Sequence, residues 1–409
     1  MMILEFTTGN FLSFRDKKTL SMEATKIKEF PNNVVDTGKY KLLRSAVIYG
    51  ANSSGKSNLI KALHFMLETI KNSSKLNSTD ELKVTPFVLN KDTAQKPSYF
   101  ELLFVIKDVR YRYGFELDTK KIYSEWLYVL PQENKSNKDL MLFARENQNV
   151  IISDGFKEGK GLAEKTRENG LFLSVCDQFN GEISKNIIKD LNLISLLSGI
   201  DHAKNSIMTS IFMERFETVT KDFFKSMQLG FTDIIRAPKE IEKALTTHNV
   251  YNKKGEVVGD YQFKIGESES AGTNKLFDLA GYILFGLIIG EPVVIDELDA
   301  KLHPILTRKI IELFHSPETN KLNAQLIFAT HDTNLLGCNC FRRDQIWFTE
   351  KDATESTDLY SLVEFKEPDG TKVRNDRSFE KDYISGRYGA IPFIGDFSNL
   401  FSHGQGEEA

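Results

Sequence analysis

The stretch Gly50-Ala51-Asn52-Ser53-Ser54-Gly55-Lys56-Ser57 decides the fold, because it fits the pattern G-x-x-x-x-G-K-[ST] at every fixed position. The apolar run 45–49 before it predicts a buried strand, and residues 58–71 after it carry apolar side chains at helical spacing. The glycines let consecutive N–H groups point at one centre, and the helix N-terminus adds partial positive charge. The sequence therefore predicts a nucleoside triphosphate site, with Lys56 on the phosphates and the Ser57 hydroxyl on Mg²⁺. A plain surface loop rich in Gly and Ser would not explain the flanking strand and helix.

The bulk composition is that of an ordinary globular protein, with 409 residues, 41% hydrophobic and 27% charged. A net charge of -4 gives no global electrostatic reason to bind nucleic acid, although local basic patches stay open. The N-terminus shows no basic region followed by a long apolar one, and the apolar run 279–290 is shorter than a bilayer requires. We expect no membrane segment and a cytoplasmic location.

The cysteines are Cys176, Cys338 and Cys340, which provide neither a disulfide framework nor a C-x-x-C pair. The Cys338-x-Cys340 pair could serve redox chemistry or a metal, but buried small apolar side chains are the better interpretation. A reducing cytoplasm and the absence of structural zinc follow as expectations.

The pattern along the chain predicts an α/β protein built as one discontinuous head. Five short segments between residues 100 and 152 indicate an antiparallel meander, and 250–265 reads as a hairpin. Helical periodicity dominates from 157 to 245, in the segments 183–193, 206–227 and 238–245, and α/β alternation follows from 273 to 349. The predicted division is an N-terminal part at 1–155, a helical insertion at 156–247 and a C-terminal part at 248–409.

Two predicted strands end in polar side chains that complete a nucleotide site. The run 292–297 is an apolar strand that ends in Asp296 and Glu297. A buried parallel strand would bring Asp296 to Mg²⁺, directly or through water, and Glu297 to the attacking water. The strand 326–329 leads to His331, which could contact the γ-phosphate or simply cap the next helix.

The segment 269–273 places small residues at the start of the apolar helix, where Ser270 and Gly272 could form a second anion site. Since the chain already has one phosphate loop, this second site would bind phosphate supplied by another copy. The alternative is a plain helix cap by Ser270.

This order of motifs resembles the ABC-type ATPase superfamily in its SMC/RecF/OLD branch. The resemblance implies a P-loop NTPase head with a mixed central sheet, an antiparallel β subdomain and, in this chain, the inserted helical domain. It also implies that two heads enclose two ATP molecules, with Ser270 and Gly272 contacting the partner's γ-phosphate and Asp299 crossing the interface. Residues 10–15 resemble the start of these heads, where Arg15 would approach the phosphates.

The stretches 296–304, 344–350 and 386–393 are similar to AAA-family ATPases of the RloA and AbiL type, found in restriction-modification and abortive-infection loci. Some features of the wider branch are missing. Gln95 is the nearest candidate for a Q-loop glutamine, and the chain has no heptad coiled coil, no zinc-hook C-x-x-C and no D-x-D motif of a Toprim nuclease. A nuclease would therefore have to come from a partner.

The segment Arg387-Tyr388 to Phe393 invites two interpretations. It could offer an aromatic and basic contact to a partner or nucleotide, or it could pack back onto the core, which is the better interpretation. Its sequence alone does not decide between them.

The expected function is an ATPase that dimerises, or forms a larger homo-oligomer, around ATP and Mg²⁺ and controls a separately encoded effector in anti-phage defence. Three alternatives stay open: a RecF- or SMC-like repair ATPase that binds DNA, a scaffold in which ATP only locks an oligomer, and a less favoured transporter ATPase subunit. The effector, its trigger and the size of the oligomer are not encoded in any motif.

Overall fold

The computed structural model describes residues 1–131, 138–200, 205–237, 244–367 and 369–392. Its centre is a sheet with the strand order β11-β15-β16-β5-β17-β18. The strands are β11 Ser195–Ser198, β15 Val293–Asp296, β16 Leu326–Ala329, β5 Ser45–Gly50, β17 Ile346–Lys351 and β18 Thr357–Ser361. Neighbouring strands are parallel except for β18, which runs antiparallel to β17. The carboxyl ends of β5, β15 and β16 therefore share one edge of the sheet.

Both faces of this central sheet are buried, which explains why its strands read as continuous apolar runs. In β5, Ile48 faces one hydrophobic core while Val47 and Tyr49 face the other. The same alternation holds in β15, where Val294 and Ile295 enter opposite cores. The sheet thus separates two cores, and its polar groups are left at the strand ends.

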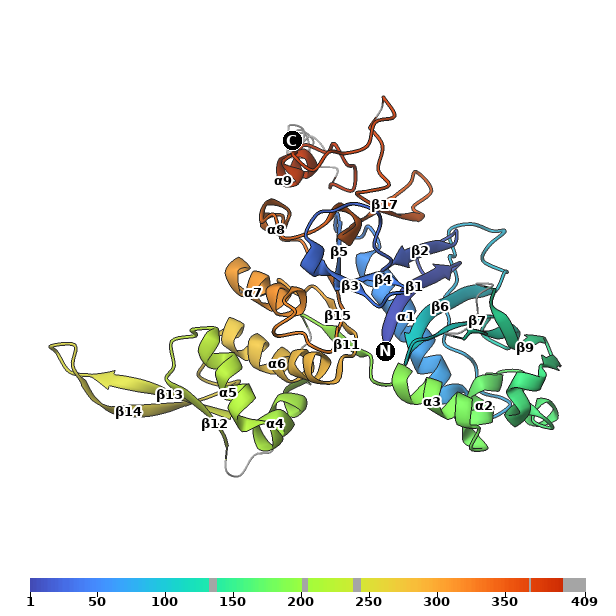
Figure 1. Ribbon diagram of the computed structural model, residues 1–409, viewed down its shortest axis with the longest axis horizontal. Helices are drawn as coiled ribbons and strands as arrows, with labels where there is room; N and C mark the ends of the chain where they lie inside the picture. Colours follow the sequence, from blue (N-terminus) through green and yellow to red (C-terminus); the bar gives the residue numbers. More distant parts are fainter. Residues whose placement is uncertain (132–137, 201–204, 238–243, 368, 393–409) are drawn as a thin grey trace, which may run out of the picture.

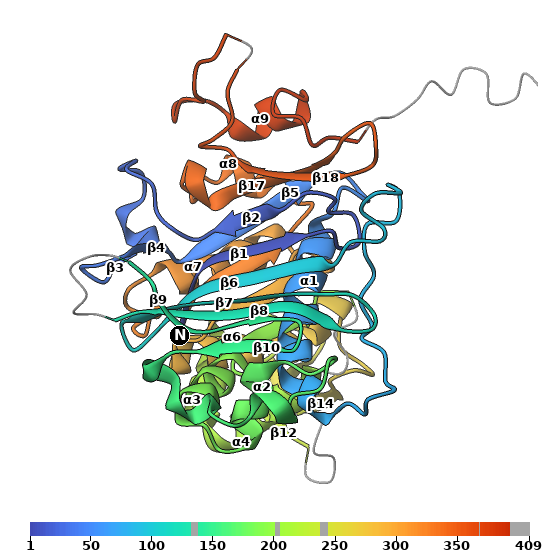
Figure 2. The same cartoon turned by 90° about the vertical axis from the view of Figure 1, so that its right-hand side faces the viewer.

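The first core is closed by an antiparallel sheet, as the meander pattern predicted, with the order β10-β9-β8-β7-β6-β1-β2. The strands are β1 Met2–Gly9, β2 Lys18–Ser21, β6 Ser98–Ile106, β7 Val109–Leu117, β8 Ile122–Leu130, β9 Leu140–Glu146 and β10 Asn149–Ile152. Helix α1 (Lys56–Asn72) runs behind this sheet in Figure 2, and its apolar face joins the core between the two sheets. A small sheet of β3 (Val34–Asp36) and β4 (Lys41–Leu43) lies nearby.

Helices cover the other face of the central sheet. They are α4 Ser206–Arg215, α5 Glu217–Ser226, α6 Ala271–Ile289, α7 Pro304–His315, α8 Asn334–Gly337 and α9 Phe379–Ile384. Helix α6 is longer than the predicted apolar run and is long and apolar enough to cross a membrane, but 67% of its most apolar window is buried. That burial is typical of a core helix.

The segment 156–247 differs from the expected helical insertion. Helices α2 (Phe172–Gln178) and α3 (Glu182–Leu191) pack into the first core, whereas α4 and α5 pack into the second. Strand β11 lies between them in sequence and extends the central sheet, so the segment is not a single helical unit. The predicted helix 206–227 is broken between α4 and α5 at Phe216, where φ is -135°.

The predicted helix 238–245 is wrong where it can be judged, since residues 238–243 lie outside the described residues and Ala244 already begins a strand. The predicted hairpin is confirmed as β13 (Ala244–Tyr251) and β14 (Val257–Lys264), with β12 (Asp233–Arg236) on the other side of β13. This ribbon extends away from the rest of the molecule in Figure 1.

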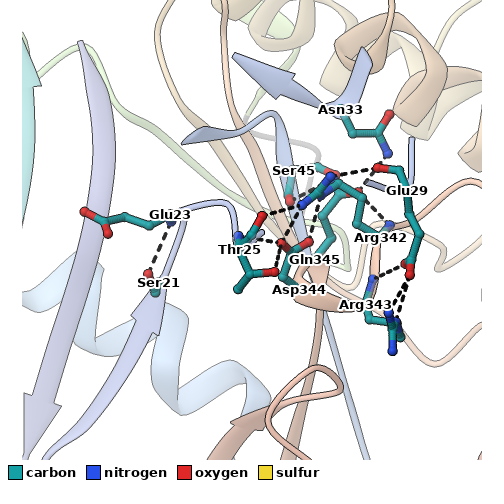
Figure 3. Close-up of polar contacts among 10 residues, drawn as sticks. All are labelled: Ser21, Glu23, Thr25, Glu29, Asn33, Ser45, Arg342, Arg343, Asp344 and Gln345. Atoms are coloured by element: carbon teal, nitrogen blue, oxygen red, sulfur yellow. Dashed lines mark hydrogen bonds and ion pairs between the residues drawn. The ribbon is translucent and has the colours of Figure 1, made fainter. Parts of the chain in front are cut away.

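A buried polar cluster holds the start of β17 against the segment after β2 (Figure 3). Asp344 accepts hydrogen bonds from the backbone N–H and the hydroxyl of Thr25, both at 2.8 Å, and pairs with Arg342 at 2.8 Å. Gln345 donates to the Ser45 hydroxyl at 2.8 Å. Because Ser45 begins β5, the cluster fixes the strand that leads to the phosphate loop.

The cysteine prediction needs a correction, because Cys338 and Cys340 form a disulfide and are only partly buried. The pair spans two positions, so it closes no long loop and does not amount to a disulfide framework. Cys176 is a free cysteine and is buried.

The C-terminal segment packs back onto the core, as the better of its two interpretations predicted. Tyr388 is fully buried, and its carbonyl accepts a hydrogen bond from the Tyr360 hydroxyl at 2.7 Å. Arg387 pairs with Glu367 at 2.7 Å, and Phe393 lies outside the described residues.

Candidate nucleotide-binding site

The loop between β5 and α1 lines a pocket at the edge of the central sheet. A pocket of about 320 Å³ is lined by residues 52–58 together with Glu297 and His331. Gly55 has φ of 119°, and a Cβ there would collide with the Thr357 side chain. This glycine is therefore required by both its backbone conformation and its neighbour.

The loop is anchored by hydroxyl groups of residues that are distant from it in sequence, namely Ser13, Thr349 and Thr357. Ser54 and Thr349 share a hydrogen bond of 2.6 Å, and the Thr357 hydroxyl donates to the Ser54 carbonyl at 2.8 Å. The Ser13 hydroxyl shares a hydrogen bond of 2.7 Å with the Thr357 hydroxyl and accepts one from the Asn58 side-chain amide at 2.8 Å. These anchors fix the loop where the first residues of α1 line the pocket.

Lys56 is the buried cation of the site. Its ammonium donates to the carbonyls of Gly50 at 2.8 Å and Ala51 at 3.0 Å, so it spans the loop in the way a phosphate-binding lysine must. Burial lowers the pKa of Lys56 to about 8, while the carboxylates of Asp296 and Glu297 act in the opposite direction. Phosphate oxygens at this position would favour the charged form further.

Carboxylates lie at or shortly after the ends of β15 and β16, although no three His, Cys, Asp or Glu side chains in the described part of the chain are grouped so as to hold a metal ion by themselves. Asp296, Asp299 and Asp332 each keep a buried side-chain oxygen without a hydrogen-bond partner. Unpaired buried carboxylate oxygens are costly, and they are the ligands that Mg²⁺ prefers. Asp296 and the Ser57 hydroxyl are therefore the groups that would hold Mg²⁺, with phosphate oxygens completing its shell.

The structure brings Glu297 and His331 to the same pocket as the loop, from two different strands. Glu297 sits in the left-handed backbone region, with φ of 55°, directly after Asp296. Burial, followed by the charge of Lys56, lowers the pKa of His331, which keeps the ring neutral near pH 7. The His331 backbone N–H donates to Asp299 at 3.4 Å and so ties the two strand ends together.

Two other predicted groups are not part of this pocket within the chain. Ser270 is exposed and caps α6, accepting from the Thr273 N–H at 3.1 Å, so the helix-cap interpretation describes its contacts in the single chain. Gly272 follows it in the first turn of α6, where a Cβ would press on the Lys301 carbonyl. Arg15 pairs with Asp16 at 2.9 Å and Asp352 at 3.5 Å instead of reaching the loop.

Several contributors to the site were not anticipated from the sequence. Thr349 and Thr357 lie on β17 and β18, and Ser13 lies in the motif that drew attention only to Arg15. No local pattern marks Thr349 or Thr357, because their role depends on the strand order of the sheet. Gln95, the candidate Q-loop residue, is exposed and does not line the pocket.

A parallel sheet, a glycine-rich loop that enters a helix, and carboxylates on neighbouring strands define the class of P-loop nucleotide-binding proteins. The chain belongs to the family described as "AAA domain, putative AbiEii toxin, Type IV TA system", which matches residues 45–337. This match confirms the predicted AAA-family ATPase.

Two solved structures are similar to the chain. The SMC head domain from Thermotoga maritima is 13% identical, with 88% of this chain and 99% of that chain covered and a TM-score of 0.41. The SmcHead bound to the C-winged helix domain of ScpA is 13% identical, with 88% and 97% covered and a TM-score of 0.33. No curated protein matches the chain.

Proposed function

We propose that the chain binds ATP with Mg²⁺ and hydrolyses it at the pocket between the β5–α1 loop and Glu297. The observation that carries this proposal is the meeting of three independent segments at one pocket: the loop at 52–58, Glu297 after β15 and His331 after β16. Lys56 and the loop N–H groups hold the phosphates, and Ser57 and Asp296 hold Mg²⁺. Glu297 orients and deprotonates the attacking water, and His331 contacts the γ-phosphate.

Phosphate release and ATP affinity, measured together, test this assignment. Glu297→Gln should lower phosphate release about 10²- to 10⁴-fold while keeping ATP affinity, because it removes only the base. Lys56→Met should weaken ATP binding at least about tenfold, because it removes a charged hydrogen-bond donor from the phosphates. Unchanged hydrolysis in Glu297→Gln would show that the base lies elsewhere.

We further propose that two copies enclose the nucleotide, each offering Ser270 and Gly272 to the partner's γ-phosphate. Support comes from the exposure of Ser270 at the N-terminus of α6, where partial positive charge favours an anion. Asp299 would cross the same interface. A permanent oligomer that ignores ATP would favour the scaffold alternative.

The biological role proposed is anti-phage defence in the cytoplasm, in which the ATPase controls a separately encoded effector. The family description, which names the AbiEii toxin and a type IV TA system, supports this role. A plaque assay on cells that carry the gene with its neighbours tests it, comparing wild type with Glu297→Gln and Lys56→Met. Equal protection by all three would contradict a role for the ATP cycle.

A further inference from the structure

Lys275 is a buried cation outside the nucleotide pocket that no predicted motif includes. It lies in the second turn of α6, and its residue is 0% exposed. Its ammonium donates to three backbone carbonyls, those of Glu297 at 2.9 Å, Leu298 at 2.8 Å and Ala300 at 2.6 Å. These three carbonyls belong to the loop that follows β15.

Burying the charge of Lys275 costs free energy, so this residue needs an explanation beyond filling space in the core. Burial lowers the pKa of Lys275 to about 8, and no carboxylate contacts its ammonium directly in the described part of the chain. An apolar side chain would occupy this place in the second core at a lower desolvation cost, because a buried charge loses its hydration. The three carbonyls offset that loss only while the loop keeps its present shape.

The loop after β15 has an unusual backbone conformation at Glu297, the proposed base for hydrolysis. Glu297 has φ of 55°, a left-handed conformation that a non-glycine residue keeps only where the surrounding structure holds it. From the end of β11, the Gly199 N–H donates to the Asp296 carbonyl at 2.6 Å. A Cβ on Gly199 would collide with the Glu297 carbonyl. The Glu297 backbone is thus held between α6 and the end of β11.

We propose that Lys275 is a positioning residue for hydrolysis: it holds the backbone of Glu297 in the strained conformation that directs the carboxylate into the phosphate pocket. This inference rests on the proposed function of Glu297. It assigns no contact between Lys275 and the nucleotide, since Lys275 does not line the pocket. Because Lys275 lies near the start of α6, which Ser270 caps, its side chain links the N-terminal end of that helix to the loop after β15.

The role predicts a split between binding and turnover. Without the three hydrogen bonds, the Glu297 carboxylate loses its fixed place, and a displacement of about 1 Å costs on the order of 100-fold in rate. Lys275→Met, which keeps an unbranched side chain one atom shorter than lysine and has no donor, should lower single-turnover phosphate release about 10- to 100-fold. Its Kd for ATP should stay within about twofold, because the loop at 52–58 is untouched.

The experiment compares wild type, Glu297→Gln, Lys275→Met and the control Lys309→Met by single-turnover phosphate release, ATP affinity and thermal melting. Lys309 is exposed on α7 and pairs with Glu312, so its loss should change neither rate nor affinity. Hydrolysis by Lys275→Met at the wild-type rate would overturn the inference. A parallel loss of affinity and rate would also overturn it, because it would indicate a purely structural role.

Gly199→Ala provides a second route if Lys275→Met does not fold, because its new Cβ pushes the Glu297 carbonyl without altering α6. It should show the same loss of rate with retained affinity, and a wild-type rate would overturn the inference. Failure of the proposed function looks different: wild type itself would then release no phosphate, or Glu297→Gln would release it normally.

Discussion

Asp296, Asp299 and Asp332 each leave a buried carboxylate oxygen unpaired at the ends of β15 and β16. An unpaired buried acceptor costs about 1–3 kcal/mol, so these residues work against the stability of the chain without nucleotide. The left-handed backbone of Glu297 also lowers the stability of the chain without nucleotide. A bound cation that contacts these oxygens would remove part of this cost.

A first prediction at this scale concerns Asp296. Asp296→Asn should melt at the same temperature as wild type or higher without ligand, because the change neutralises a buried carboxylate that has an unpaired oxygen. With Mg²⁺ and ATP at about 100 times Kd, wild type should gain about 2.7 kcal/mol, whereas Asp296→Asn should gain clearly less. Thermal melts with Mg²⁺ or with a chelator measure both effects.

Equal stabilisation of Asp296→Asn and wild type by Mg²⁺ and ATP would contradict the metal assignment. ATP with the chelator is the internal control, because it reports phosphate binding by Lys56 and the loop alone.

His315 predicts how stability depends on pH. Burial lowers its pKa to about 3, and its Nε2 lies 2.7 Å from the Ser45 hydroxyl. The unfolded chain takes up this proton near pH 6.5 and the folded chain does not, so folding weakens as pH falls below 6.5. The contribution is at most about 1.4 kcal/mol per pH unit.

Urea unfolding at several values between pH 7.5 and 5.5 measures this slope. His315→Gln should flatten it, and the exposed control His64→Gln should leave it unchanged. The same slope in His315→Gln as in wild type would assign the pH dependence to other groups.

At the scale of elements, the junction of β17 with the segment after β2 rests on charges (Figure 3). Arg342 and Asp344 are 2% and 3% exposed, and their pair is completed by Thr25. The chain offers a matched comparison in Arg374 and Asp376, which have the same spacing and a 2.6 Å contact but are 78% and 58% exposed. Burial is the main difference between the two pairs.

Asp344→Ala should therefore destabilise the protein by about 3–5 kcal/mol, because it leaves the Arg342 charge buried and uncompensated. Asp376→Ala should cost about 1 kcal/mol or less, because water solvates Arg374. Denaturant unfolding of both variants checks the difference. Equal costs would show that the cluster does not hold β17 in place.

The elements around the site follow from local patterns, which is why the sequence predicts them well. The strand before Gly50, helix α1, the meander and the strand ending in Asp296 all have periodic apolar residues with clear breaks. Strand β11 has no such signal, since its four residues become a strand only by pairing with β15. The helix break at Phe216 likewise depends on tertiary packing.

The residues of the candidate site also fall into those that a local motif predicts and those that depend on long-range contacts. Lys56, Asp296, Glu297 and His331 were predicted because each lies in a recognisable motif at a strand end. Thr349 and Lys275 were missed, because their contacts join elements far apart in sequence. The one local signal for Lys275 was a lysine near the start of a largely apolar helix, which also carries Asp278.

At the scale of the whole molecule, the predicted motifs fall into two groups. The loop at 52–58, Glu297 and His331 share one pocket, whereas Ser270 lies exposed at the N-terminus of α6 and does not line it. A single copy therefore has an incomplete set of phosphate contacts under the proposed function. A second copy would supply the missing one.

The most direct test is the mass in solution of Glu297→Gln, measured with and without ATP and Mg²⁺. Because this variant should bind ATP without hydrolysing it, the account predicts a mass that doubles with ATP. The doubling should be lost in the double variant Glu297→Gln, Ser270→Arg, provided its melting temperature is that of a folded protein. A mass that ignores both ATP and Ser270 would contradict the two-copy site.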